Sequence, residues 1–200
     1  MKRFLLYLSI ISAFLLLCLG LAYFYIEKRV TRFDLPKGEL KWSKTRPENA
    51  KMCLPAAFTD VNGGITGAYR ISGKSYHDNN KRKVSLVDNS FIISPKWRSS
   101  NGFQQLTLVY NSRPMTFKDT RKYIRRALCK TKKEAFILES NYPMTMSAFA
   151  HYCSKQCTDA AYLDMGEYGY GYIKYGIFTR PLYIWAYFSR QKQTNWLYIE

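Results

Sequence analysis

The longest apolar pattern in the chain lies near its beginning. Phe4 to Ile26 is a run of 23 residues without a charge, with Lys2 and Arg3 before it and Glu27 after it. A helix of that length spans a bilayer. A cleaved signal would have a shorter apolar run followed by small residues, so we expect an uncleaved anchor over residues 1–29, although cleavage is the alternative.

Beyond this run, short apolar stretches alternate with turn-forming residues. Each stretch is rich in β-branched and aromatic residues and is bounded by Gly, Asn or Pro, which is typical of strands. Near the end, Leu182 to Phe188 alternates in a way that predicts a strand with one buried face, and Trp196 to Ile199 predicts another. The other predicted strands are Ala56 to Phe58, Ala68 to Ile71, Val84 to Leu86, Phe91 to Ile93, Leu106 to Tyr110, Ala135 to Leu138 and Ala160 to Leu163.

Helical patterns are sparse. Phe117 to Ile124 predicts one helix, and Met146 to Ser154 predicts a better one, with Thr145 as its N-cap. Residues 30–50 mix Pro, Gly and charge without either period, so they predict a stalk. The expected architecture is α+β and sheet-dominated, with residues 51–200 forming a single domain.

The chain is strongly basic. It has 31 Lys and Arg against 14 Asp and Glu, and without Lys2 and Arg3 the remainder carries a net charge of +15. Such a domain favours anionic partners. The basic residues are spread along the chain without a nucleic-acid-binding motif, so we expect an anionic phosphorylated glycan or envelope polymer rather than nucleic acid. A solvated basic surface beside an anionic membrane is the alternative explanation.

The orientation of the predicted anchor rests on weaker signals. Lys28, Arg29, Arg32 and Lys37 follow the apolar run, and the positive-inside rule would keep them in the cytoplasm. Long domains can be translocated regardless of charge. We therefore expect a single-pass membrane protein whose domain lies on the exported, periplasmic or extracellular side.

Four cysteines lie outside the apolar run. Cys53, Cys129, Cys153 and Cys157 could form two disulfides, and the sequence leaves all three pairings open. His151 with Cys153 and Cys157 could instead be read as metal ligands. Because a second His/Cys pair is lacking, we expect no metal and no cofactor.

The most unusual stretch runs from Ala161 to Tyr172. A predicted strand leads into Asp164 and then into a loop of alternating Gly and Tyr. Gly166, Gly169 and Gly171 allow close approach of the backbone to a ligand, and the tyrosine rings offer faces for sugars. The alternative is a simple Gly/Tyr-rich hairpin in which Asp164 caps a turn.

A series of motifs follows in order from residue 53 to 172: Pro55-Ala-Ala-Phe58, Gly67 with Gly73-Lys74, Leu106 to Ser112, Arg125-Arg-Ala127, Phe136 to Glu139, Thr145 to Tyr152, and Leu163-Asp-Met-Gly166. Their order resembles the phosphodiester glycosidase family, which includes the enzyme that uncovers mannose 6-phosphate by removing N-acetylglucosamine. Several positions differ from the family pattern: Pro55 replaces Asn, Ala56 and Ala57 replace a double Gly, and Met165 replaces the Gly after the Asp.

The resemblance implies a hydrolase for sugar-1-phosphodiesters, with Arg125 and Asp164 at the family's Arg and Asp positions. In such a reaction positive charge develops at the anomeric carbon while phosphate leaves, so the site needs a carboxylate and a cationic clamp. We expect Asp164, Arg125 and Glu139 to be catalytic, and Arg126, Gly166, Glu167, Tyr168 and Gln105 to bind substrate. The alternative is a decayed module of the same fold that binds anionic glycan or lipid, and an exposed basic edge remains the plainer explanation of Arg125 and Arg126.

Overall fold

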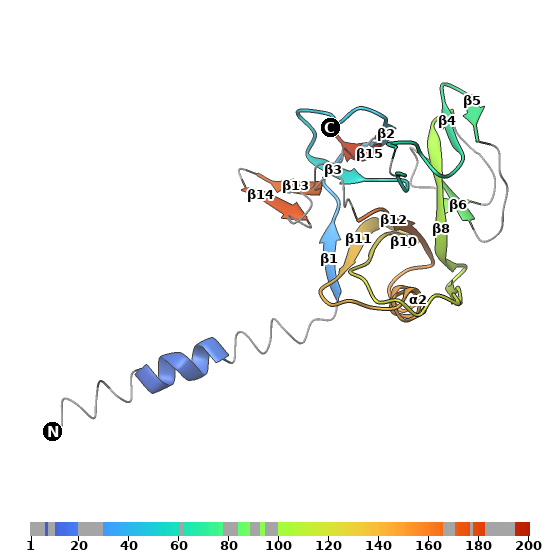
Figure 1. Ribbon diagram of the computed structural model, residues 1–200. Helices are drawn as coiled ribbons and strands as arrows, with labels where there is room; N and C mark the ends of the chain where they lie inside the picture. Colours follow the sequence, from blue (N-terminus) through green and yellow to red (C-terminus); the bar gives the residue numbers. More distant parts are fainter. Residues whose placement is uncertain are drawn as a thin grey trace.

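The computed structural model shows two β-sheets and one short helix packed in layers (Figure 1). It describes residues 7, 11–19, 30–60, 62–77, 84–88, 93–94, 100–165, 171–176, 178–182 and 195–200. Strands dominate these residues, which confirms the predicted sheet-dominated α+β class.

Sheet A contains ten strands and is built around the order β1-β11-β10-β12-β8-β4-β5; β6 and β9 also pair with β8, and β7 pairs with β6. All of its described pairings are antiparallel. Its strands are β1 (Val30–Asp34), β4 (Tyr69–Ile71), β5 (Lys74–Tyr76), β6 (Val84–Asp88), β7 (Ile93–Ser94), β8 (Gly102–Tyr110), β9 (Arg113–Pro114), β10 (Arg126–Lys130), β11 (Ala135–Ser140) and β12 (Asp159–Leu163).

Sheet B has five strands in the order β14-β13-β3-β15-β2. It combines the two ends of the domain, because β15, the last strand of the chain, lies between β3 and β2. Its strands are β2 (Leu40–Ser43), β3 (Met52–Pro55), β13 (Gly171–Tyr175), β14 (Phe178–Leu182) and β15 (Trp196–Ile199).

Two apolar cores hold these layers together. The first lies between the sheets and joins Leu128 and Ile137 of sheet A to Leu54 and Leu197 of sheet B. The second lies on the other face of sheet A, where α2 (Met146–Ser154) covers it with Met146, Phe149, Ala150 and Cys153. These helix residues recur at the three- and four-residue spacing of one helix face. Thr145 caps the helix as predicted, since its hydroxyl accepts a hydrogen bond from the Ala148 amide at 3.2 Å.

Most predicted strands coincide with observed ones, and three predictions are wrong. Residues 30–50, expected to form a stalk, instead supply β1 and β2, and Leu40 is completely buried. Residues 117–124 are not helical; they form no regular element apart from the isolated bridge that pairs Tyr123 with Met144. Ala56 and Ala57 are buried as expected, but they follow β3 rather than forming a strand. The predicted strand Leu182 to Phe188 lies, beyond Leu182, outside the described residues.

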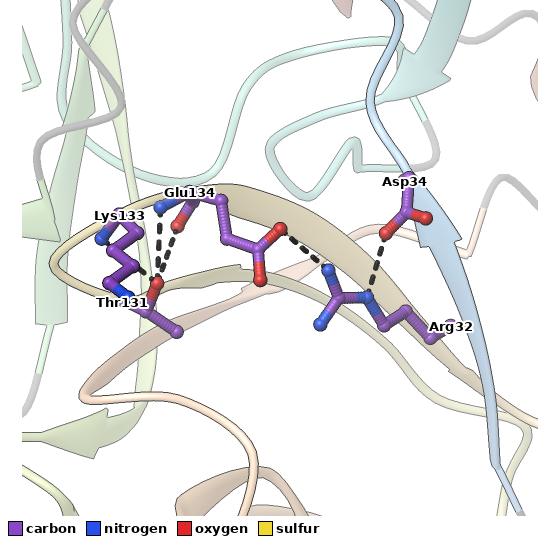
Figure 2. A network of polar contacts seen from close by, with 5 residues as sticks. All are labelled: Arg32, Asp34, Thr131, Lys133 and Glu134. Atoms are coloured by element: carbon purple, nitrogen blue, oxygen red, sulfur yellow. Dashed lines mark hydrogen bonds and ion pairs between the residues drawn. The ribbon is translucent and has the colours of Figure 1, made fainter.

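Strand β1 is fixed to sheet A by Arg32 as well as by its backbone pairing with β11. The guanidinium lies between the carboxylates of Asp34 and Glu134, at 2.7 Å from each, and over the ring of Phe136 at 4.0 Å. Figure 2 shows the two ion pairs of Arg32 beside the turn that Thr131 closes, where the Thr131 hydroxyl accepts bonds from the amides of Lys133 and Glu134. The hydrogen bond to Glu134, followed by that to Asp34, raises the pKa of Arg32.

Within the described part of the apolar N-terminal run, residues 11–19 are helical, and their large side chains are exposed. No helix in the described ranges combines the length and apolarity needed to cross a membrane.

The role of β1 in the core can be measured with Phe33→Ala. Phe33 is 4% exposed and packs in the core between the sheets, so its truncation should lower the free energy of unfolding by about 3–4 kcal/mol. The neighbouring control Arg32→Ala removes a half-exposed ion-pair network and should cost about 1 kcal/mol or less. Urea unfolding of the full chain in detergent measures both, and equal losses would contradict a buried β1.

Candidate functional site

Strands β10, β11 and β12 bring two predicted site residues into contact at one end of sheet A. The register places Arg126 opposite Glu139 on one side and opposite Leu163 on the other. The Arg126 Nε atom donates to Glu139 Oε2 at 2.7 Å, and Nη2 lies 2.6 Å from the same oxygen. The Arg126 side chain is 0% exposed and that of Glu139 is 15% exposed, so this is a desolvated ion pair.

The Arg126 guanidinium retains hydrogen-bonding capacity. Among the described residues its Nη1 atom has no hydrogen-bond partner, and Nη2, despite its short contact with Glu139, lacks the orientation of a hydrogen bond. We regard the Nη2 contact as electrostatic, because its distance is that of an ion pair. A buried guanidinium with unused donors is the geometry that a phosphate or carboxylate oxygen would complete.

Arg125 faces the opposite side of the sheet. Successive strand residues point to opposite faces, so Arg125 shares a face with Ala127, two residues further on. Ala127 packs in the core beneath α2. The Arg125 guanidinium donates to the carbonyl oxygens of Met144 at 3.3 Å and Arg121 at 3.1 Å. It also lies 5.0 Å from the ring of Tyr123. Arg125 therefore ties two loops to the sheet, and its side chain does not contact Glu139.

Asp164 follows Leu163 directly at the end of β12. Its amide donates to the Ala56 carbonyl at 2.9 Å, and the residue is 9% exposed. Burial raises the pKa of the nearby Tyr162 hydroxyl. The positive charges of Arg125 and Arg126 oppose this rise, and the negative charge of Asp164 adds to it. The Arg125 guanidinium lies 5.8 Å from the Tyr162 ring, and the sequence analysis had not singled out this buried phenol.

The remaining predicted residues are placed as follows. Gln105 on β8 is 2% exposed, and its Oε1 atom accepts from the Leu106 amide at 2.8 Å, while its Nε2 atom is buried without a partner in the described structure. Gly166, Glu167 and Tyr168 lie outside the described residues. Gly171 is needed for packing, because a Cβ there would come within 2.7 Å of a Leu54 methyl group.

Asn195 is a second residue that the sequence analysis missed. Its Oδ1 atom accepts from the Ala57 amide at 2.6 Å, and its Nδ2 atom donates to the Ala57 carbonyl at 3.0 Å. The Asn195 carbonyl also accepts from the Ala56 amide at 3.4 Å. Together with the bond from the Asp164 amide, these contacts engage the backbone polar groups of both alanines. Asn195 thus joins the end of β3 to the start of β15, and Asp164 joins the end of β12 to the same segment. Only its place before β15 distinguished it in the sequence.

The cysteines separate into two locations. Cys129 of β10, Cys153 of α2 and Cys157 meet in the core beneath the helix, whereas Cys53 lies on the outer face of sheet B with Tyr172 and Trp196. All four are free thiols. Burial, with contributions from Cys153 and Cys157, raises the pKa of Cys129 well above its usual range. In the described ranges no three His, Cys, Asp or Glu side chains are arranged to hold a metal ion.

No protein-family model matches the chain, and no curated protein matches its sequence.

A double-mutant cycle measures whether Arg126 and Glu139 act as a desolvated pair. Arg126→Met or Glu139→Leu alone leaves one buried charge without its partner and should cost about 3–5 kcal/mol of unfolding free energy. The double variant removes both charges and should recover most of that loss. Urea unfolding of the three variants provides the coupling energy, and strictly additive losses would contradict the pairing.

The buried thiol of Cys53 predicts a loss of stability at alkaline pH. Burial, opposed by Arg46, raises the pKa of Cys53 from 9.0 to about 12. Below the pKa of the unfolded thiol, about 8.5, both states are protonated and the contribution is constant. Above it the unfolded thiol ionises while the folded one stays protonated, so stability falls as pH rises towards the folded pKa.

Cys53→Ala should therefore show a shallower decline in its urea midpoint between about pH 8 and pH 10 than the unmodified protein. Equal slopes in the two proteins would show that the Cys53 thiol does not contribute.

Proposed function

We propose that the protein is a membrane-anchored hydrolase that cleaves the glycosidic bond of a sugar-1-phosphodiester. The observation that carries the proposal is the Arg126–Glu139 pair, which lies in the register row next to Asp164 at the end of β12. A cation with unused donors and a carboxylate beside it are the two groups that this reaction needs.

In this proposal Arg126 binds the phosphate. A guanidinium matches phosphate oxygens in geometry, and Nη1 of Arg126 is available for such a bond. Glu139 holds the guanidinium in place through Nε and is a positioning residue. Arg125 takes a different role from the one expected from sequence, because its donors are engaged by the carbonyl groups of Arg121 and Met144.

Asp164 is the proposed catalytic carboxylate. Water adds to the anomeric carbon, the bond from that carbon to the phosphate oxygen breaks, and the phosphate departs as a monoester. Asp164 stabilises the positive charge that develops on the sugar and accepts the proton of the attacking water. The departing phosphate keeps both electrons of the broken bond, and the adjacent Arg126 stabilises its charge.

The location proposed for this activity is the exported side of a membrane. The 23-residue apolar run supports an anchor, as do the exposed apolar side chains along the helical residues 11–19. The net charge of +15 beyond the anchor favours anionic phosphorylated glycans as partners.

A specific observation favours a second function, a module that binds anionic glycan without cleaving it. The backbone groups of Ala56 and Ala57, which stand where the family has its double Gly, are occupied by Asn195 and Asp164. The Arg126 guanidinium is also completely buried, as in an ion pair that only supports the fold. The two functions differ in whether Asp164 performs chemistry.

The test compares Asp164→Asn with Asp159→Asn in full-length protein held in detergent. Asp159 lies at the opposite end of β12, where its carboxylate accepts a bond from the Asn111 amide at 3.1 Å, so it is a matched carboxylate away from the site. With the methyl diester of a sugar 1-phosphate as substrate, Asp164→Asn should lower turnover by at least about 100-fold and Asp159→Asn should leave it nearly unchanged. Thermal unfolding of both variants controls for folding.

Equal turnover in the Asp164→Asn variant and the unmodified protein would refute the catalytic assignment. If the unmodified protein binds sugar 1-phosphate by calorimetry and turns over none of the diester, the binding module is the correct function.

A further inference from the structure

We infer that the substrate of the proposed site is lipid-linked: a sugar whose anomeric carbon is joined through phosphate to an alcohol embedded in the membrane. This inference rests on the proposed function and deepens it. It comes from the position of the site relative to the end of the apolar run, which the register of sheet A determines.

The domain begins almost immediately after the apolar run. Only Glu27, Lys28 and Arg29 separate Ile26 from Val30, the first residue of β1. Three extended residues reach at most about 10 Å. The headgroup layer on each side of a bilayer is itself about 5–8 Å thick. With the run in the membrane, the start of β1 therefore lies at the headgroup surface.

The candidate site lies at that same end of sheet A. Val30 pairs with Ser140, and the next row across the sheet joins Thr31, Glu139, Arg126 and Leu163 in adjacent strands. Neighbouring strands are about 4.8 Å apart, so Arg126 is about 10 Å and Leu163 about 14 Å from Thr31 along this row. The opposite end of the sheet carries Asp34, Lys130 and Asp159.

These distances keep the Arg126 row within about 30 Å of the hydrocarbon, whatever the tilt of the sheet. A phosphodiester that links a sugar to a lipid alcohol presents its phosphate at the headgroup level. A soluble phosphodiester has no such constraint and would be served equally well by a domain on a long stalk. The absence of a stalk between residues 26 and 30, together with the basic charge of the domain, favours the lipid-linked substrate.

A spacer tests this inference directly. Four EAAAK repeats inserted between Arg29 and Val30 form a semi-rigid helix that lifts the domain by about 30 Å. Full-length protein and the spacer variant are reconstituted in vesicles that contain a polyprenyl-phosphate sugar, and each is also assayed on the soluble methyl diester. The spacer should lower turnover of the vesicle-bound substrate by about tenfold or more, because it removes the site from the surface that concentrates the substrate. Turnover of the soluble diester should stay the same.

A second measurement locates the site without relying on activity. In a Cys18→Ser background, a fluorophore is attached to Tyr142→Cys, an exposed position just beyond β11 at the site end, or to Lys132→Cys, an exposed position in the turn at the opposite end. Quencher-labelled lipid headgroups should quench the label at position 142 several-fold more than the label at position 132.

The outcomes separate this inference from the proposed function. Turnover of the soluble diester with a spacer-independent rate on vesicles overturns the lipid-linked substrate and leaves the hydrolase intact. If neither substrate is turned over but the quenching is as expected, the hydrolase function and the lipid-linked substrate are both wrong. The position of the site at the membrane surface is then retained. Equal quenching at the two positions overturns the geometric basis of the inference.

Discussion

Both faces of sheet A are covered, one by sheet B and the other by α2, so its central strands lie in a dry environment. A charged side chain in such a strand is stable only when an opposite charge or hydrogen-bonding groups offset the loss of its hydration. Arg126 meets this condition through Glu139, which the register places directly across from it. On the other face Arg125 meets it differently, by donating to backbone carbonyl groups of two loops. The packing at this end of the domain therefore depends on the contacts of the Arg125 and Arg126 guanidinium groups.

The sequence predicted the fold class and many elements because their patterns are local. The range of α2 follows from Thr145 and the spacing of Met146, Phe149 and Cys153, and β15 follows from four consecutive apolar residues. Strands β1 and β2 were missed because each is short and carries charged residues on its outer side, such as Arg32 and Lys41, with Pro36 and Gly38 between them. Their apolar positions are meaningful only once the partner sheets are known, since tertiary packing decides such segments.

The site was only partly predictable for a related reason. Arg125 and Arg126 are adjacent, and the residues that follow, Ala127, Leu128 and Cys129, are apolar on both faces of the strand. A strand buried on both sides shows no alternation, so its sequence cannot indicate which arginine shares a face with Glu139. The register shows that Arg126, and not Arg125, shares a face with Glu139. Asn195 was beyond reach from sequence, because its contacts with Ala57 join residues 138 positions apart.

The central place of β15 in sheet B has a consequence for how the chain acquires its structure during synthesis. Strands β2 and β3 both pair with β15 and not with each other, so neither can complete its hydrogen bonding until residues 196–199 have been made. A ribosome adds residues from the N-terminus at about 5–20 per second, and it shields the newest part of the chain. Sheet B therefore closes only after residues 196–199 have left the ribosome, and until then β2 and β3 remain incompletely paired.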